Sequence, residues 1–493
     1  MKNKLIYLFG PFICIAMIFT ACAAANGAPT PQTNGLAEGP PAEDPPAAQS
    51  LSEATGASAH NVILIIADDF GVDMVALYNE SAADLPPTPN IDALLDEGVL
   101  FENAWTNPIC SPTRAAMLTG RYGFRTGVGD PVANTDEGIR LSEFTLPEAI
   151  TAGSSFDYTH ANIGKWHLSS QQNGARDNPN LSGYDHFSGV LRGGLRDYSE
   201  WTKVVNGTNV DVTNYATTET VNDAISWIDD QNQQDKPFFL WLAFNAPHSP
   251  FHLPPLDLHS YDDLAPTGES DRDYYKAMVE AMDTEIGRLL DSLPADVRAN
   301  TTVVFIGDNG TPGQVVQSPL TRHSAKGSLY DGGVHVPLII SGPKVASPGR
   351  TLEALVNSVD MFATVLELMG IDVAETVPMA ESLDSVSMVP YMSNTTHTEA
   401  REWVFAERFG SNERADYAKA IRDEQYKLIV FEDGDVELYD LQSDQFEANN
   451  LLAAGASLSA DQQMGYCALV TDITDLLQSE PGQTLPQVPE ECG

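Results

Sequence analysis

Two pairs of oxygen-bearing side chains follow two strongly apolar segments of this chain. Asp68 and Asp69 end the segment HNVILIIADD, and Asp308 with Asn309 follows TTVVFIG. Three carboxylates and one amide suit Ca²⁺ or Mg²⁺ and do not suit zinc, which prefers nitrogen and sulfur ligands. Either pair alone is better explained as a helix cap or a turn. Because both pairs end predicted strands of one sheet, we expect them to form a metal site.

A second set of side chains is cationic or titratable. Lysine and arginine beside a divalent ion form a site for an anion with several equivalent oxygens. Isolated histidines more often have structural roles, but one of these lies in GKWHL, two residues after a lysine, and one in the rigid segment NAPHSP. Among the other histidines, His323 is the first that we would add, because it lies near Lys326. The predicted set is Arg114, Lys165, His167, His248 and Lys326.

Cys110 opens the segment CSPTRAAMLTGR, which has the pattern of a helix start. Ser111 and Pro112 suit the first helical positions, so the thiol would lie at the positive end of the helix dipole. A thiolate there would be an activated nucleophile, whereas a single cysteine is commonly a small core residue. Beside a hard metal an unmodified thiol is chemically unexpected, because soft sulfur gains little from Ca²⁺ or Mg²⁺.

The segments that position these residues alternate between strand and helix patterns from residue 60 onward. Continuous apolar runs predict buried strands within 60–69, 237–247, 301–310 and 336–343, and a weaker strand within 156–164. Helical spacing of apolar residues predicts helices at 88–101, 213–231 and 271–293. We therefore predict a large doubly wound α/β fold, with a mixed, mostly parallel sheet flanked by helices.

The pattern changes after about residue 395. Short alternating runs at 403–409, 417–423, 426–432 and 436–441 predict an antiparallel sheet with tight turns, and 461–479 predicts a helix. We therefore divide the folded part of the chain into a catalytic domain at 59–395 and a smaller C-terminal α+β subdomain at 396–493.

The first 58 residues predict export. Residues 1–22 have a charged start, an apolar run and small residues at the end, as in a bacterial export signal, and the run is short for a bilayer span. The stretch FTAC is similar to a lipoprotein processing site, which would place a lipid on Cys22; simple cleavage is the alternative. Residues 23–58 are rich in Pro, Ala, Gly and Ser and predict a disordered tether. The expected location is the periplasm or the outer-membrane surface of a bacterium.

The composition narrows the range of partners. The chain has 26 basic and 69 acidic residues, a net charge of −43, which argues against nucleic-acid binding because such binding needs a basic face. An anionic substrate stays compatible, because a few local cations can reverse the field inside a cleft. Beyond the leader the cysteines are Cys110, Cys467 and Cys492. In an exported protein the last two could form a disulfide, which would leave Cys110 unpaired.

Together these residues resemble the sulfatase family of the alkaline phosphatase superfamily, whose motif is C-x-P-x-R followed by L-T-G. Here the motif stands as CSPTR and LTGR. The resemblance covers roughly residues 60–455 and includes, in the family's order, NVILIIADD, PNIDALLDEGVLFENAW, CSPTRAAMLTGRY, GKWHL, APHSP, GDNG, KGSLYDGGVHVP and ELYDLQSDQFEANNL.

The resemblance implies a sulfuric ester hydrolase. A separate maturation enzyme would convert Cys110 to formylglycine (3-oxoalanine), whose hydrate offers oxygen in place of sulfur. One hydrate oxygen, assisted by Asp308, would attack the sulfate ester and form a covalent sulfo-enzyme intermediate, from which inorganic sulfate is released. The implied ligands of Ca²⁺, with Mg²⁺ as the weaker alternative, are Asp68, Asp69, residue 110, Asp308 and Asn309.

The resemblance also implies the remaining roles. Lys165, His248 and Lys326 would bind the sulfate, and Lys326 or His248 would protonate the leaving oxygen. His167 would be the base partner that lets the aldehyde form again, and Arg114 would hold the hydrate. The family pattern E-G-G-x-R-V-P after the lysine is DGGVHVP here, with Asp331 and His335. This departure leaves open the conformation of that loop and how the substrate fits beside it.

Sulfated carbohydrate is the expected substrate, from the predicted export, the tether and the acidity. Two alternatives stay open. One is a phosphodiesterase or phosphonate monoester hydrolase of the same superfamily, and the other is an inactive surface protein that binds sulfated glycans and keeps the Cys110 thiol. Trp166, Tyr198 and Trp201 could line sugar subsites but are better explained as packing residues.

Overall fold

The computed structural model describes residues 59–79, 82, 84–378, 380–395, 400–410, 414, 416–488 and 492. The predicted export signal at 1–22, with its lipid on Cys22, and the tether at 23–58 lie outside these residues and stay predictions. No helix in the described part of the chain combines the length and the apolar character that crossing a bilayer requires.

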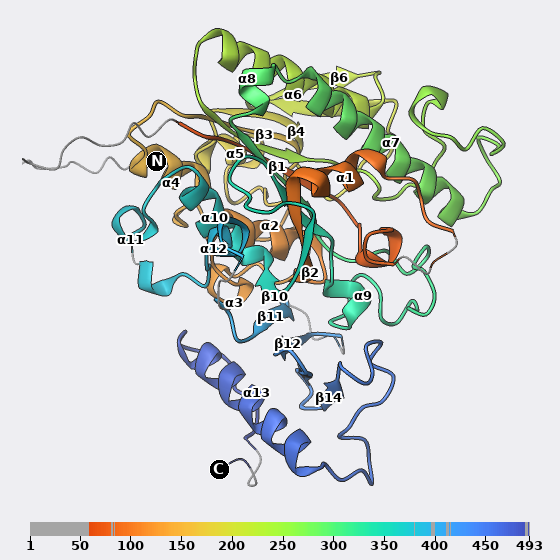
Figure 1. Ribbon diagram of the computed structural model, residues 1–493, viewed down its shortest axis with the longest axis vertical. Helices are drawn as coiled ribbons and strands as arrows, with labels where there is room; N and C mark the ends of the chain where they lie inside the picture. The colour runs from red at the N-terminus through yellow and green to blue at the C-terminus, as the bar shows by residue number, and fades with distance from the viewer. Residues whose placement is uncertain are drawn as a thin grey trace, which may run out of the picture. The chain divides into compact units, whose positions relative to one another are not determined.

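A ten-stranded sheet in the order β10-β2-β9-β8-β1-β7-β3-β4-β5-β6 forms the centre of the fold (Figure 1). The pairs β1–β7, β1–β8, β3–β7, β3–β4 and β2–β10 are parallel, and the other pairs are antiparallel. The strands are β1 (Asn61–Ala67), β2 (Gly98–Trp105), β3 (Thr159–Lys165), β4 (His186–Val190), β5 (Trp201–Val205), β6 (Thr208–Val212), β7 (Phe238–Ala243), β8 (Thr301–Gly307), β9 (Leu338–Ser341) and β10 (Arg350–Asn357).

Helices cover both faces of this sheet. Alternate side chains of β1 belong to two separate cores: Ile63 and Ile65 pack with α6 and α7, and Leu64 packs with α2, α4 and α10. The helices are α1 (Pro89–Ala93), α2 (Cys110–Thr119), α3 (Gly123–Thr126), α4 (Leu146–Gly153), α5 (Asn178–Leu181), α6 (Ala216–Gln233), α7 (Asp271–Ser292), α8 (Ala295–Arg298), α9 (Asp331–Val334), α10 (Met361–Leu368), α11 (Val373–Thr376) and α12 (Val389–Ser393). Short 3-10 turns are η1 (Val72–Met74), η2 (Leu94–Glu97), η3 (Ala175–Asp177), η4 (Leu256–Leu258), η5 (Ser358–Asp360) and η6 (Ala380–Ser382).

A second, antiparallel sheet has the order β11-β12-β13-β14 and carries the helix α13 (Ala460–Gln478). One face packs on α13 through Leu428 and Leu469, and the other face packs with Trp105 of β2 through Ala420 and Ile429. Its strands are β11 (Val404–Arg408), β12 (Ala418–Arg422), β13 (Tyr426–Phe431) and β14 (Val436–Asp440).

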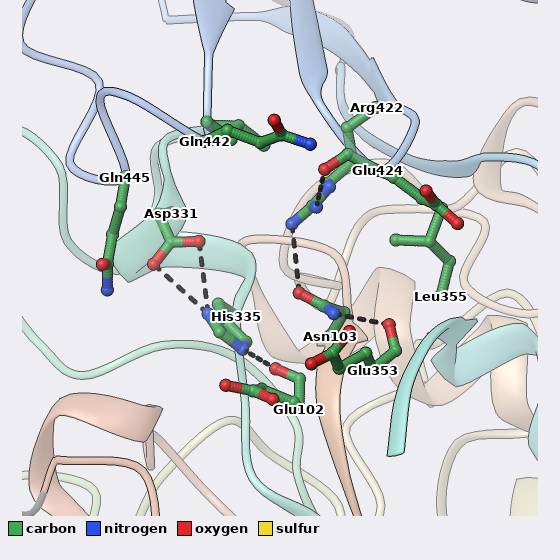
Figure 2. Close-up of a pocket in the computed structure, with 11 residues that line it drawn as sticks. Glu102, Asn103, Asp331, His335, Glu353, Leu355, Arg422, Glu424, Gln442 and Gln445 are labelled. Atoms are coloured by element: carbon green, nitrogen blue, oxygen red, sulfur yellow. Dashed lines mark hydrogen bonds and ion pairs between the residues drawn. The ribbon is translucent and has the colours of Figure 1, made fainter.

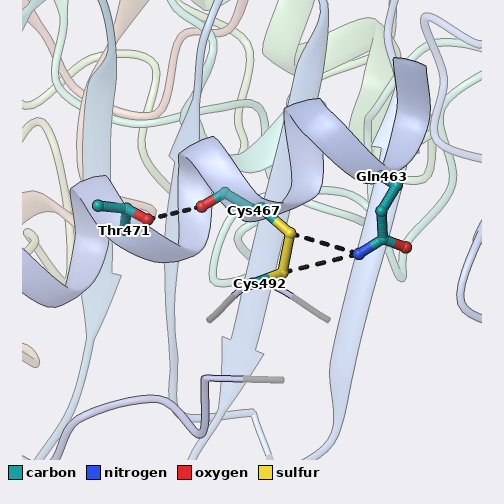
Figure 3. The surroundings of a disulfide bond; sticks show 4 residues. All are labelled: Gln463, Cys467, Thr471 and Cys492. Atoms are coloured by element: carbon teal, nitrogen blue, oxygen red, sulfur yellow. Dashed lines mark hydrogen bonds between the residues drawn. A yellow bond between two sulfur atoms is a disulfide. The ribbon is translucent and has the colours of Figure 1, made fainter. Parts of the chain in front are cut away.

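A disulfide joins Cys467 of α13 to Cys492, with the Cα atoms 5.1 Å apart. The amide of Gln463 points toward both sulfurs (Figure 3). Cys110 is the free cysteine among the described residues, and it is buried.

The predicted fold class is confirmed, with the mixed sheet, the helices on both faces and the small antiparallel sheet with its helix. The boundary at residue 395 stays a prediction. The prediction of one helix over 88–101 is wrong, because helical structure ends at Glu97 and β2 begins at Gly98. A Cβ on Gly98 would lie 2.5 Å from the Leu94 carbonyl oxygen, so glycine permits a tight change from helix to strand.

His60 makes the stability of this fold depend on pH. Its imidazole is buried with Nε2 2.8 Å from Thr302 Oγ1, and burial, with Lys344 adding to it, lowers the pKa from 6.5 to about 4. The unfolded chain therefore takes up the proton at higher pH than the folded chain, so stability is lost as the pH falls from about 6.5 to about 4.

We expect His60→Gln to remove this loss. Between pH 7 and pH 5, the free energy of unfolding should fall by about 1–2 kcal/mol less in the variant than in the wild type, measured by urea titration at each pH. His323→Gln, at an exposed histidine, is the control. Equal pH dependence of His60→Gln and the wild type would contradict this role.

Candidate active site

Four neighbouring strands bring the predicted site residues to one edge of the large sheet. Strands β8, β1, β7 and β3 are adjacent and parallel, so their carboxyl ends meet at the same edge, where open α/β sheets bind ligands. Polar residues follow each of them, namely Asp68 and Asp69 after β1, Lys165 at the end of β3, His248 after β7, and Asp308 and Asn309 after β8.

Helix α2 carries the cysteine motif into this edge. Cys110 is its first residue, Arg114 lies one turn later, and every residue of the helix is buried. The helix ends at Gly120, whose φ of 68° is left-handed and favours glycine. A Cβ at Gly120 would lie 2.9 Å from the ring of Phe362, so the L-T-G part of the motif ends the helix in close contact with α10.

Two buried ion pairs fix two of the carboxylates at this edge of the sheet. Asp68 Oδ2 accepts a hydrogen bond from Lys165 Nζ at 2.6 Å, and Asp308 Oδ2 accepts from Arg114 Nε and Nη2 at 2.9 and 2.8 Å. Arg114 also donates to the Lys165 carbonyl at 2.7 Å, which joins the two pairs. Burial raises the pKa of Asp68 to about 6, although Lys165 opposes this shift.

The remaining polar groups of the site contact Asp69. Lys326 Nζ and Asn309 Nδ2 both donate to its Oδ1, and His248 Nε2 lies 3.8 Å from its Oδ2. Burial alone would raise the pKa of Asp69, but Lys326, followed by His248 and Lys165, outweighs burial and holds the pKa below its ordinary value. Asp69 therefore stays ionised.

The donor set fits a hard cation. The ligand atoms of Asp68, Cys110 and Asp308 all lie within 4.8 Å of one another. Asp68 Oδ1 and Asn309 Oδ1 are buried, and neither has a hydrogen-bond partner within the described part of the chain. Buried oxygens of this kind normally have a partner, and a cation at the centre of the group would supply it.

Cys110 and His167 face one another inside this group. Cys110 Sγ lies 3.0 Å from His167 Nδ1, and Ser111 Oγ donates to the His167 carbonyl at 2.8 Å. Burial, followed by Lys165 and Arg114, lowers the pKa of His167 well below its ordinary value, so its imidazole is neutral. Burial also raises the pKa of the Cys110 thiol, although Lys165 and Lys326 oppose it, so the thiol is not an activated nucleophile.

The segment that departs from the family pattern lies beside a cleft of about 390 Å³ (Figure 2). Asp331 and His335 form an ion pair at 3.2 Å, and His335 Nε2 lies 2.6 Å from the Glu102 carbonyl oxygen. The pair holds α9 in place, and the Gly333 carbonyl of α9 accepts a hydrogen bond from Gly310 at 3.0 Å. The aspartate–histidine pair therefore supports the turn that follows Asn309.

The structure brings together all ten residues predicted for the site, through the contacts above, whereas their individual roles stay predictions. Trp166 and Tyr198 are buried in the two cores and Trp201 packs partly against one of them, which confirms the packing explanation. Two glycines were missed. A Cβ on Gly193 would lie 2.5 Å from His167 Cε1, and one on Gly194 would lie 2.9 Å from His248 Cε1. The signal available in the sequence was the RGG run at 192–194, one residue after the segment that forms β4.

Family comparison agrees with this geometry. Residues 60–371 match the sulfatase family model, and residues 322–466 match the model of the N-sulphoglucosamine sulphohydrolase C-terminal region. The chain therefore belongs to the sulfatase family and is a sulfuric ester hydrolase.

Individual relatives are distant in sequence. The uncharacterized sulfatase YdeN of Escherichia coli is 28% identical over 436 residues, which cover 76% of this chain and 75% of YdeN. The N-acetylgalactosamine-6-sulfatase of Rattus norvegicus is 28% identical over 366 residues, covering 67% of this chain and 65% of the rat protein. Among solved structures, Ps i-CgsB in complex with k-i-k-neocarrahexaose has a TM-score of 0.72 and 26% identity, covering 87% of this chain and 95% of that one.

Gly193 is expected to be necessary for the position of His167. Gly193→Ala would force the imidazole away from Cys110, and we expect kcat for 4-nitrophenyl sulfate to fall by about 10- to 100-fold, as for other displacements of about 1 Å. Glu200→Ala, at an exposed side chain before β5, is the matched control and should leave kcat unchanged. Full activity in Gly193→Ala would show that the close approach of Gly193 is not required.

Proposed function

We propose that this protein hydrolyses sulfate esters of a sulfated carbohydrate, after a separate maturation enzyme has converted Cys110 to formylglycine. The observation that carries this proposal is the position of Cys110. It lies at the start of a buried helix, 3.0 Å from His167 and among the oxygens of Asp68 and Asp308. Lys165 lies beside Asp68, and Lys326 and His248 lie beside the neighbouring Asp69, so cations are at hand for an anionic sulfate group.

The chemistry of residue 110 supports the conversion. A buried thiol whose pKa is raised is a weak nucleophile, and sulfur is a poor ligand for the hard cation that the neighbouring oxygens favour. The hydrate of an aldehyde at this position would offer two hydroxyl oxygens instead. His167, which is neutral and within reach of this position, can accept a proton from such a hydroxyl.

We propose Ca²⁺ as the metal, with Mg²⁺ as the alternative. A divalent cation supplies charge that stabilises hydroxide and sulfate oxygens. The donor atoms are oxygens of carboxylates and of one amide, and such donors suit Ca²⁺. Two of these oxygens, Asp68 Oδ1 and Asn309 Oδ1, have no hydrogen-bond partner within the described residues. The proposed ligands besides residue 110 are Asp68, Asp69, Asp308 and Asn309.

Exposure separates the roles of the cations. The Lys165 side chain is 0% exposed and forms an ion pair with Asp68, so we assign it to binding the sulfate group from the buried side of the site. Lys326 and His248 are 20% and 21% exposed, so either can reach the leaving oxygen of a bound ester and protonate it. Arg114 donates two hydrogen bonds to one oxygen of Asp308, Oδ2, and we assign it to positioning residue 110 through that carboxylate.

Relatives support a carbohydrate substrate. One relative is named for N-acetylgalactosamine 6-sulfate, and one structural neighbour holds a neocarrahexaose. The predicted leader suits the same proposal, because it would place the enzyme in the periplasm or, with a lipid on Cys22, on the outer-membrane surface. Both locations give access to polysaccharide.

The mass of the peptide that contains Cys110 tests the maturation. We expect it to be lighter than the thiol form in protein from a host that has the maturation enzyme. That preparation should release sulfate from 4-nitrophenyl sulfate faster than it hydrolyses bis(4-nitrophenyl) phosphate. Cys110→Ala should remove the sulfatase activity.

Two results would contradict the proposal. Preference for the phosphate diester would favour the phosphodiesterase, and an unmodified thiol in protein that binds sulfated glycans without cleaving them would favour the inactive binding protein.

Thermal unfolding tests the metal without relying on activity. Ca²⁺ should raise the Tm of chelator-treated protein more than Mg²⁺ at equal concentration, because a ligand that binds only the folded state stabilises it. Asn309→Ala should reduce this rise, whereas Asn209→Ala, at an exposed residue of β6, should leave it unchanged. An equal Ca²⁺ effect in both variants would exclude Asn309 as a ligand.

A further inference from the structure

A cleft next to Lys326 is lined by cations. Its volume is about 560 Å³, within the range of ligand pockets, and it lies between residues 322–330 of the catalytic domain and strands β11 to β13. The charged residues among those that line it are Arg322, Lys326, Arg408, Arg414 and Asp416.

The sign of this charge is opposite to that of the chain as a whole. The cleft in Figure 2 is lined by one arginine, Arg422, and by four carboxylates, those of Glu102, Asp331, Glu353 and Glu424. A third cleft of about 760 Å³ beside α13 is also acidic, and none of its described lining residues is lysine or arginine. In a protein of net charge −43, the lining of this cleft holds four cations and one carboxylate. Two more carboxylates outside the lining, Asp69 and Asp130, pair with Lys326 and Arg408, so the four cations still exceed their carboxylate partners and the local field favours anions.

Lys326 connects this cleft to the active site. The Lys326 ammonium pairs with Asp69, while the same residue lines the cleft. Arg408 braces the next residue, because its Nη1 donates to the Gly327 carbonyl at 2.7 Å. Arg408 is also paired with Asp130 at 3.0 Å and Asp416 at 2.7 Å, so it is held by the protein itself.

Arg322 is the cation most available to a ligand, because it is exposed and makes no hydrogen bond or ion pair with any described residue. Arg414 is also exposed, but its Nε and Nη2 each donate to Asp416 at 2.8 Å, so it offers a ligand only its remaining donors. The cleft also has an aromatic and apolar wall. The rings of His323 and Tyr330 lie 4.8 Å apart, and Phe431 lines the cleft from β13. Such a wall suits the apolar face of a sugar ring.

We propose that this cleft binds a second anionic group of the substrate, a sulfate or carboxylate on a sugar adjacent to the one whose ester is cleaved. Arg322 and Arg414 then select oligosaccharides that carry more than one anion. This inference rests on the proposed function, because the cleft meets the active site at Lys326.

The experiment compares two galactan hexasaccharides, one sulfated on every sugar and one carrying a single sulfate. Binding is measured by calorimetry with Ca²⁺ in the full chain carrying Cys110→Ala, which cannot turn over. We expect the fully sulfated ligand to bind at least about tenfold more tightly, a ratio that two exposed charge contacts can supply. Arg322→Ala should lower this ratio by about threefold, and Arg322→Glu should lower it further.

Arg298→Ala is the matched control. Arg298 precedes β8 and therefore lies at the opposite edge of the sheet, where it pairs with Glu97 at 2.8 Å. The ratio should stay unchanged in this variant. An unchanged ratio in both Arg322 variants, or an equal loss of affinity for the two ligands, would overturn the proposal. Absence of sulfate release by matured protein would overturn the proposed function instead, and the binding ratio would still decide the role of the cleft.

Discussion

Three carboxylates buried in one small volume are compatible with folding only because each has a cation of its own. Asp68 pairs with Lys165, Asp69 with Lys326 and Asp308 with Arg114. Removing one partner of such a buried pair leaves an uncompensated charge and generally costs about 3–5 kcal/mol. Two of these cations, Lys165 and Lys326, contact the substrate in the proposed function, so the same side chains also keep the active-site edge of the sheet folded.

The charge balance of this group indicates which anions it can accept. Asp68, Asp69 and Asp308 are matched by Arg114, Lys165 and Lys326, so these six groups sum to zero when all are ionised. A divalent cation would add two positive charges. A sulfate monoester carries one negative charge, and one deprotonated hydroxyl at residue 110 would carry the second. A phosphate diester has the same charge as a sulfate ester and is therefore the serious alternative, whereas a phosphate monoester would leave excess negative charge.

The sequence was sufficient for those parts of the fold and site that depend on local patterns. Apolar runs identified β1, β7 and β8 because both faces of these strands are buried. The polar residues that end each run could then be assigned to the carboxyl ends of the strands. Strand β10 was missed, since its first half is partly exposed and its sequence RTLEALVN has no continuous apolar run. The helix predicted at 88–101 was too long because helical spacing continues into β2, which pairing with β9 and β10 converts to strand.

Contacts between segments that are far apart in the chain could not be predicted from the sequence. The Gly193 approach to His167 requires β4 to lie beside β3, and the cationic cleft requires the small sheet to face residues 322–330. His323 was singled out by its nearness to Lys326 alone, and the structure places it on the wall of that cleft. Arg322 and Arg414 had no distinguishing signal, because single arginines on polar segments look alike until the fold places them together.

The two sheets have different roles in the proposed enzyme. Groups that handle the reacting ester come from the ends of the large sheet and from α2, whose positions are set by buried strands. Residues of the small sheet and of the segment that follows it contact the loops that border the active site. Arg408 braces Gly327, and Glu447 accepts a hydrogen bond from the Asp331 amide at 2.7 Å while pairing with Lys427. The segment that departs from the family pattern, 331–335, lies at this junction. A change in the small sheet can therefore alter the space beside Lys326 without moving Asp68, Asp69 and Asp308, the carboxylates to which the proposed function assigns the metal.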